Sequence, residues 1–204
     1  MLTMTDTTAR PGHRRPGGRT AKVRTAVLRA TEAALADDGY EALSIDDVAQ
    51  RAGVHKTTVY RRWPSKAELV ADAMRERSTE RVEVPDTGTL AGDLHALARA
   101  VTANIGSDDG SAITRNLLAA TITSDAVADD MPRFWSERLQ LTGTIVERAV
   151  ARGELPAGAD PHVIIETLIG PLYVRLLLTG EALTSAVADQ VARIVAAGAA
   201  AGAR

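Results

Sequence analysis

The side chains with the clearest chemistry lie close together between residues 55 and 66. This segment contains lysines, arginines, threonines, a histidine and a tyrosine, with few apolar residues among them. Lysine and arginine neutralise phosphates or contact guanine edges, and threonine binds phosphate or touches a thymine methyl group. A tyrosine adds an apolar ring and a hydroxyl that can reach a phosphate. This combination of residues is typical of a surface that contacts nucleic acid.

A helix is predicted immediately before this segment. Its buried face is marked by apolar residues at i, i+3, i+4 and i+7, which are Ile45, Val48, Ala49 and Ala52. Ser44 precedes them, so its hydroxyl can cap the helix, and Asp47 completes a weak capping box. Gly53 supplies the left-handed conformation that ends such a helix.

A second short helix is predicted from about His55 to Trp63. Val59 and Trp63 lie four residues apart, so they share one face and are expected to be buried. Pro64 then stops the helix. Two short helices joined by a tight glycine-containing turn form the helix-turn-helix unit that reads DNA.

A third helix is predicted from this point to about Arg81. Ser65 and Glu68 form its capping box, and Lys66 in its first turn is expected to point at the phosphate backbone. The predicted DNA-contacting residues are Ser44, His55, Lys56, Thr57, Thr58, Tyr60, Arg61, Arg62 and Lys66.

Several of these residues have a second interpretation. Tyr60 could belong to the core, and Arg61 and Arg62 could be ordinary solvated charges. His55 is as readily a simple turn residue as a base contact.

Charge is distributed unevenly along the chain. The formal net charge is −2, but residues 1–66 carry a net charge of +5 and residues 67–204 a net charge of −7. A basic head on an acidic body is expected if only the head meets nucleic acid. The alternative is a local fluctuation in charge without functional meaning.

The residue content excludes several kinds of chemistry. The chain has no cysteine, so disulfides, thiolate catalysis and cysteine-based zinc sites are excluded. Its four histidines are scattered, and the sequence has no HExxH pattern, phosphate-binding glycine loop or G-x-S-x-G elbow. We therefore expect no enzymatic activity, no metal and no cofactor.

No membrane segment is expected. The first twenty residues are polar and lack the apolar core of a signal peptide. The two longest apolar stretches, residues 163–178 and 191–203, are interrupted by Glu166, Arg175 and Arg193. These features predict a cytoplasmic protein.

The chain is predicted to be all-α and to have three parts. Residues 1–19 are expected to form a disordered basic arm, which either follows DNA or has no specific role. Residues 20–80 would form an N-terminal helix-turn-helix domain, and residues 81–204 a C-terminal helical domain. In the C-terminal part, helices are predicted over residues 89–104, 112–123, 127–152, 161–179 and 183–201. A turn is predicted over residues 106–110, and Pro132 is expected to break or start the third of these helices.

The segment Val54–Leu69 resembles the signature of the TetR family of bacterial transcriptional regulators, most closely in Thr-Val-Tyr-Arg-Arg-Trp-Pro-Ser-Lys-Ala-Glu-Leu. The resemblance covers about Thr20 to Met74 and includes Gly39-Tyr40, which in that family packs the first helix on the motif. His55 departs from the family pattern, because serine more often caps this helix.

The resemblance implies a double-stranded DNA operator, a homodimer and a small-molecule effector as partners. In the family, the helical body encloses a ligand whose binding changes the spacing of the two DNA-reading heads. The candidate ligand-binding residues are Leu94, Leu97, Val101, Asn104, Arg115, Leu117, Leu118, Phe134, Trp135, Leu139, Tyr173 and Arg175. Any apolar member of this set could equally be an ordinary core residue. The scarcity of aromatic residues favours a mainly aliphatic pocket and a hydrophobic ligand.

The last two predicted helices are strongly apolar. The first is apolar around most of its circumference, so it must be buried on several sides. In TetR-like proteins these helices form a four-helix dimer interface. The implied interface residues are Ile165, Leu168, Leu172, Leu176, Val187, Val191, Ile194 and Val195. Burial of these residues entirely within one subunit is the alternative.

The sequence therefore predicts a ligand-responsive, DNA-binding transcriptional regulator, most simply a repressor that binds a palindromic operator. Two other hypotheses remain open. One is a small-molecule-binding or catalytic helical protein with a vestigial motif, and the other is a sequence-neutral protein that coats the chromosome.

Overall fold

The computed structural model describes residues 17–201, and this part of the chain is helical without strands. The first five helices are α1 (Gly17–Asp37), α2 (Gly39–Ala42), α3 (Ile45–Arg51), α4 (Lys56–Tyr60) and α5 (Lys66–Arg81). They are followed by α6 (Leu90–Gly106), α7 (Asp108–Thr123), α8 (Asp125–Ala151), α9 (Pro161–Val174), the π-helical turn η1 (Arg175–Thr179) and α10 (Ser185–Ala201). The predicted all-α fold class is confirmed.

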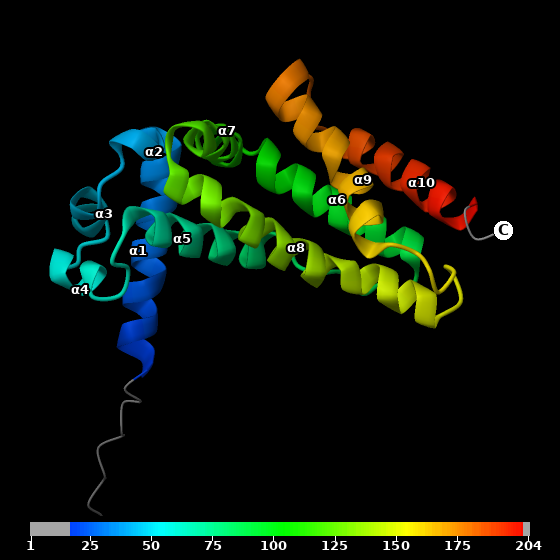
Figure 1. Ribbon diagram of the computed structural model, residues 1–204, viewed down its shortest axis with the longest axis horizontal. Coiled ribbons are helices and arrows are strands. Elements are labelled where there is room, and N and C mark those ends of the chain that lie inside the picture. Colours follow the sequence, from blue (N-terminus) through cyan, green and yellow to red (C-terminus); the bar gives the residue numbers. More distant parts are fainter. Residues whose placement is uncertain (1–16, 202–204) are drawn as a thin grey trace, which may run out of the picture.

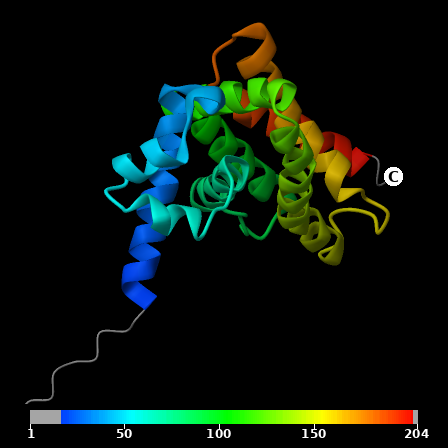
Figure 2. The same ribbon diagram turned by 60° about the vertical axis from the view of Figure 1, so that its left-hand side comes forward.

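The helices enclose two hydrophobic cores. Helices α1 to α4 lie at one end of the molecule and α9 and α10 at the other, with α6, α7 and α8 between them (Figures 1 and 2). One core lies within α1 to α5 and takes in Ile113, Ala120 and Val127 from α7 and α8. The other core joins α6, α8, α9 and α10. We call α1 to α5 the head and α6 to α10 the body. The head therefore packs directly against the body through a shared core.

The predicted start and end of α3, the first helix of the helix-turn-helix motif, are present in the structure. The Ser44 hydroxyl accepts a hydrogen bond from the Asp47 N–H at 3.1 Å, which starts α3 as predicted. The Asp47 carboxylate does not complete the predicted capping box, because it accepts a hydrogen bond from Arg51 Nε at 2.8 Å instead. Gly53 has a φ of +65°, the left-handed conformation expected after α3.

A hydrogen bond to Trp63 fixes the end of the recognition segment, by which we mean residues 55–63. Val59 is fully buried, and Trp63 is only 5% exposed, as predicted. The Trp63 indole N–H donates to Asp72 Oδ2 at 3.0 Å, and Arg24 Nη2 donates to Asp72 Oδ1 at 3.0 Å. Asp72 therefore joins α1, α5 and the residue that anchors α4.

Several of the predicted helices differ from the structure, and α4 is shorter than predicted, covering Lys56–Tyr60. Helix α1 begins at Gly17, so residues 17–19 belong to a helix, while the rest of the predicted arm lies outside the described residues. Helix α7 begins at Asp108 instead of residue 112, because the Ser107 hydroxyl caps it by accepting from the Gly110 N–H at 3.2 Å. Pro132 lies inside α8 and does not break it. A proline removes one helical N–H donor, and the remaining bonds of this 27-residue helix continue on both sides.

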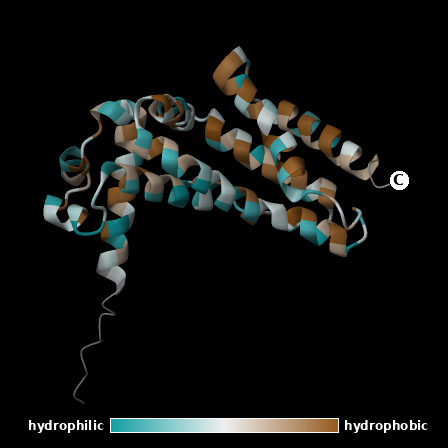
Figure 3. Ribbon diagram, in the orientation of Figure 1, coloured by the Kyte–Doolittle hydropathy of each residue, from teal (hydrophilic) through white to brown (hydrophobic). Residues whose placement is uncertain are grey.

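The predicted dimer interface needs correction. Figure 3 shows that α9 and α10 are largely apolar, as expected. Five of the predicted interface residues nevertheless have their side chains buried within one chain, namely Ile165, Leu168, Leu172, Leu176 and Val195. Val187 and Val191 are half-buried in the same core, and only Ile194 is well exposed. The residues predicted for the interface instead form the face that packs on α6 and α8. The sequence did not distinguish the two faces, because a helix that is apolar nearly all round does not show which face points inward.

One described segment, Pro161–Thr179, is long and apolar enough to span a membrane by composition alone. Its inner residues pack instead into the second core, against α6, α8 and α10. The segment ends at Gly180, whose φ of +68° turns the chain toward α10.

We predict that Asp72→Ala lowers the free energy of unfolding by about 1–3 kcal/mol, because the buried Trp63 N–H loses its acceptor. Urea unfolding followed by circular dichroism measures this change. Asp129→Ala, at an exposed position of α8, is the matched control and should change stability by less than about 0.5 kcal/mol. Equal effects of the two substitutions would show that Asp72 does not hold the recognition segment.

Candidate nucleic-acid interface and body cavity

The outer face of α4 is polar and exposed. With Val59 and Trp63 buried, the neighbouring side chains have no room in the core and point outward. The exposed residues are His55, Lys56, Thr57, Tyr60, Arg61 and Arg62, and Thr58 is half-buried. Tyr60 is 46% exposed, so it is not the core aromatic that the alternative interpretation required.

Several of these exposed groups have partners within the head. Lys56 Nζ donates to Asp46 Oδ2 at 2.8 Å, and this hydrogen bond to the carboxylate raises the lysine pKa. His55 is the residue before α4, but its ring does not cap the helix and instead lies 3.0 Å from the Thr57 hydroxyl. These surface contacts are weak enough to be exchanged for contacts with phosphates.

The two arginines differ in their surroundings. The Arg62 guanidinium lies 5.3 Å from the centre of the Trp63 ring, which holds it beside α4. Arg61, Arg62 and Thr58 also line a groove that α4 forms with the N-terminal half of α1. Both arginines are therefore exposed beside this groove, whereas Tyr60 is exposed outside it.

Lys66 differs from the prediction. Its ammonium donates to the backbone carbonyls of Tyr40 and Glu41 at 2.8 and 3.3 Å, and it lies 4.2 Å from the centre of the Tyr40 ring. These carbonyls are the acceptors left at the end of the short helix α2, so a nearby cation is favoured there. Lys66 thus ties α5 to α2 and does not point outward at a phosphate.

Ser44 is exposed, and its hydroxyl caps α3. A role for this hydroxyl in DNA contact stays a prediction, as it does for the outward residues of α4.

A cavity of about 200 Å³ lies in the body, between α5, α6, α7, α8 and α9. Most of the predicted ligand-binding residues line it. These are Leu97, Val101, Asn104, Leu117, Leu118, Phe134, Trp135, Leu139 and Tyr173. Trp135 forms edge-to-face contacts with Phe134 and Tyr173, each with ring centres 5.5 Å apart. The lining is thus partly aromatic as well as aliphatic.

Three predicted ligand-binding residues do not line the cavity. Leu94 is fully buried in the second core, on the same face of α6 as Leu97 and Val101 but one turn nearer the start of the helix, where the cavity does not reach. Arg115 is exposed on the outside of α7, and Arg175 forms an ion pair with Glu181 at 2.7 Å. Helical periodicity did not show that Arg115 and Arg175 face away from the cavity, or how far along α6 the cavity extends.

The sequence analysis missed several polar lining residues, including Arg77, Ser78, Thr114 and Arg138. Arg77 and Ser78 lie in α5, which was assigned to the head alone. Arg138 follows Phe134 and Trp135 by four and three residues, so it shares their helix face, and this spacing was a usable signal.

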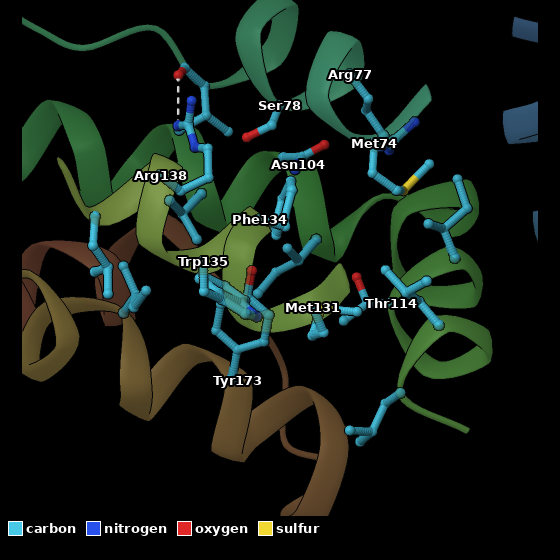
Figure 4. Close-up of a pocket in the computed structure, with 18 of the residues that line it drawn as sticks. Met74, Arg77, Ser78, Asn104, Thr114, Met131, Phe134, Trp135, Arg138 and Tyr173 are labelled. Atoms are coloured by element: carbon cyan, nitrogen blue, oxygen red, sulfur yellow. Dashed lines mark hydrogen bonds between the residues drawn. The ribbon is translucent and has the colours of Figure 1, made fainter. Parts of the chain in front are cut away.

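The two cavity arginines are bound differently. Arg77 Nη1 donates to Glu32 of α1 and to Asp109 of α7, each at 2.9 Å. Arg138 Nη2 donates to the backbone carbonyl of Val82 at 3.1 Å. Figure 4 shows both side chains beside α5, with Trp135 and Tyr173 on the side of the cavity toward α9. Among the described residues, no group of three or more histidine, aspartate or glutamate side chains is arranged to hold a metal ion.

Comparison with known families supports the fold and the motif. Residues 27–73 match the family model described as bacterial regulatory proteins, tetR family. Residues 84–195 match the model described as Tetracyclin repressor-like, C-terminal domain. The two matches together span both halves of the described structure.

Individual proteins agree with these matches. HTH-type transcriptional regulator AqdR of Rhodococcus erythropolis is 30% identical over 88% of this chain and 86% of its own length. The DNA-binding transcriptional repressor TetR of Mycobacteroides abscessus is 32% identical over 76% of this chain and 82% of its own. The crystal structure of the TetR family transcription regulator SCO0332 superposes with a TM-score of 0.72 at 30% identity, covering 87% of this chain and 98% of that one.

All of these relatives are regulators, which form a non-enzymatic class. Motif, fold and relatives lead to one conclusion. The chain belongs to the TetR family of DNA-binding transcriptional regulators.

Proposed function

We propose that this protein is a cytoplasmic, homodimeric repressor that binds a palindromic operator and is released by a small molecule held in the body cavity. The observation that carries the proposal is the outer face of α4, where Tyr60, Arg61 and Arg62 are exposed around a buried Val59. In a helix-turn-helix protein, this face enters the major groove. The relative from Mycobacteroides abscessus is itself named a repressor.

The proposed dimer uses the outer faces of the last two helices. Val163, Val174 and Leu178 are large apolar side chains exposed on α9 and η1, and Ile194 is exposed on α10. Leu178 is 79% exposed and Ile194 is 62% exposed. Exposed apolar side chains gathered on neighbouring helices are a common mark of a subunit interface. A two-fold dimer would present two α4 helices to half-sites separated by a whole number of helical turns.

The proposed effector response depends on α5. This helix begins at the reading motif, where Lys66 holds α2, and its C-terminal half contributes Met74, Arg77 and Ser78 to the cavity. A ligand that favours one position of α5 therefore also favours one position of the head. A coupling free energy of about 1–3 kcal/mol is sufficient for a switch of ordinary size.

For DNA binding, we predict that Arg61→Ala weakens binding to DNA fragments selected from the genome by the wild-type protein. The plot of log affinity against log salt concentration should become shallower by about 0.9, because one phosphate contact is lost. Gel-shift titrations at several salt concentrations measure both quantities.

The matched control is Arg115→Ala, which removes the same charge from an exposed site on α7. It should leave affinity and slope unchanged. If Arg61→Ala behaves like the control, α4 is not the contact surface, as a vestigial motif would require. Equal affinity of the wild-type protein for scrambled DNA would favour the chromosome-coating hypothesis.

For the dimer, we predict that Leu178→Asp converts the protein into a folded monomer, because a charge in the interface core loses its hydration without gaining a partner. Sedimentation velocity measures the mass in solution. Leu141→Asp, which alters an exposed leucine of α8, should leave the dimer intact. A dimer that survives Leu178→Asp would assign the interface to another surface.

A further inference from the structure

The charged residues around the body cavity all have one sign. Arg77 and Arg138 are charged, and none of the residues that line the cavity is acidic. The remaining lining is apolar, apart from hydroxyl groups and the Asn104 amide. A negatively charged ligand would therefore not be repelled by any residue that lines the cavity.

The charge of Arg77 is already balanced inside the protein. Its Nη1 bonds to Glu32 and Asp109, each at 2.9 Å. Partial burial acts to raise the pKa of Asp109, but hydrogen bonds from Arg77 and Ser107 outweigh it and lower this pKa to about 2. Asp109 is consequently ionised at neutral pH. Arg77 thus acts mainly as a tie between α1, α5 and α7.

The charge of Arg138 is not balanced in this way. Its one hydrogen-bonded partner within residues 17–201 is the neutral carbonyl of Val82, and its Nη1 is buried without any acceptor. Burial lowers the pKa of the guanidinium below its usual value. Arg138 is half-buried, and a partly desolvated cation without a counter-ion is destabilised, because water can occupy a donor but does not neutralise the charge.

The opposite side of the cavity suits an apolar body. Figure 4 shows Arg138, Ser78 and Asn104 toward α5 and α6, and Trp135 and Tyr173 toward α9. The Asn104 Oδ1 atom is also buried without a partner. Burial raises the pKa of the Tyr173 hydroxyl to about 12, so this group remains a neutral hydrogen-bond donor. Arg138 and the unpaired Asn104 oxygen therefore lie on the α5 and α6 side of the cavity, and the rings of Trp135 and Tyr173 lie on the α9 side.

We propose that the effector is an amphipathic organic anion, such as a carboxylate on a hydrocarbon body. Its anionic oxygens accept hydrogen bonds from Arg138, and its apolar part lies against Trp135 and Tyr173. A planar guanidinium suits a carboxylate because it can donate two parallel N–H bonds. This inference rests on the proposed effector function and adds the chemical class of the ligand.

Calorimetric titration of the full-length protein at pH 7.5 tests the proposal with three eight-carbon probes: octanoate, octan-1-ol and octylamine. They share a hydrocarbon chain and differ in charge. Octanoate should bind about ten- to a hundredfold more tightly than the alcohol, as expected for hydrogen bonds to a charged group. The amine should bind more weakly than the alcohol, because its charge repels Arg138.

Three variants test whether Arg138 causes the preference for octanoate over octan-1-ol. Arg138→Gln should reduce the preference for octanoate over octan-1-ol to below about threefold and leave the alcohol's affinity unchanged. Arg138→Lys keeps the positive charge, so it should retain a preference of more than about threefold. Arg115→Gln, which removes an exposed arginine outside the cavity, should behave like the wild type.

Equal binding of octanoate and octan-1-ol to the wild type would overturn the proposal, as would an unchanged preference in Arg138→Gln. Failure of all three probes to bind the folded protein would also overturn it. Release of bound genomic DNA is measured separately with the same probes. Octanoate that binds through Arg138 without releasing DNA contradicts the effector function but supports the anion site. Equal release by the alcohol and octanoate supports the effector function and overturns the anion site.

Discussion

The structure depends on the burial of Val59 and Trp63 beneath α4. Helix α4 has five residues, a length at which an isolated helix is not stable in water. Its conformation must therefore come from tertiary contacts, and these are provided by Val59 in the core and by the Trp63 indole bonded to Asp72. Because one side of so short a helix is fixed in this way, the remaining side chains face solvent. The same contact that stabilises the head thus creates its polar outer surface.

Helix α5 extends this constraint from the head to the body. At its start, Lys66 bonds to the carbonyls at the end of α2, and near its end the buried Arg77 joins Glu32 of α1 to Asp109 of α7. Met74, Arg77 and Ser78, in the second half of α5, line the cavity. Buried ion pairs of this kind are costly to break, so the head and α5 are expected to move together. This arrangement gives a ligand in the cavity a direct physical route to the DNA-reading surface.

The sequence predicted the structure correctly where a residue pattern is compatible with only one local structure. Periodic apolar residues, the Ser44 and Ser65 caps and the left-handed Gly53 located the helices of the head, and Val59 and Trp63 were correctly assigned to the core. The family resemblance was confirmed by the family models and the relatives, and the all-α fold class by the structure.

The sequence did not predict the position of a side chain where several positions were compatible with the pattern and tertiary contacts selected one of them. Both faces of the segment formed by α9 and η1 are apolar, so periodicity did not reveal that Leu168 and Leu172 face inward while Leu178 of η1 faces solvent. Lys66 was a plausible phosphate contact until the fold brought two carbonyl groups of α2 to it. The spacing of Arg138 from Phe134 and Trp135 could have placed it on the cavity wall, but its lack of a counter-charge among residues 17–201 depends on contacts between residues distant in the sequence.

Methylation interference on the DNA that the protein selects tests whether the outer face of α4 reads DNA from the major groove. Methyl groups on guanine N7 lie in the major groove, whereas those on adenine N3 lie in the minor groove. We expect N7 methylation to prevent binding at two clusters of guanines separated by a whole number of helical turns. Interference confined to adenine N3, or no interference at either position, would contradict it.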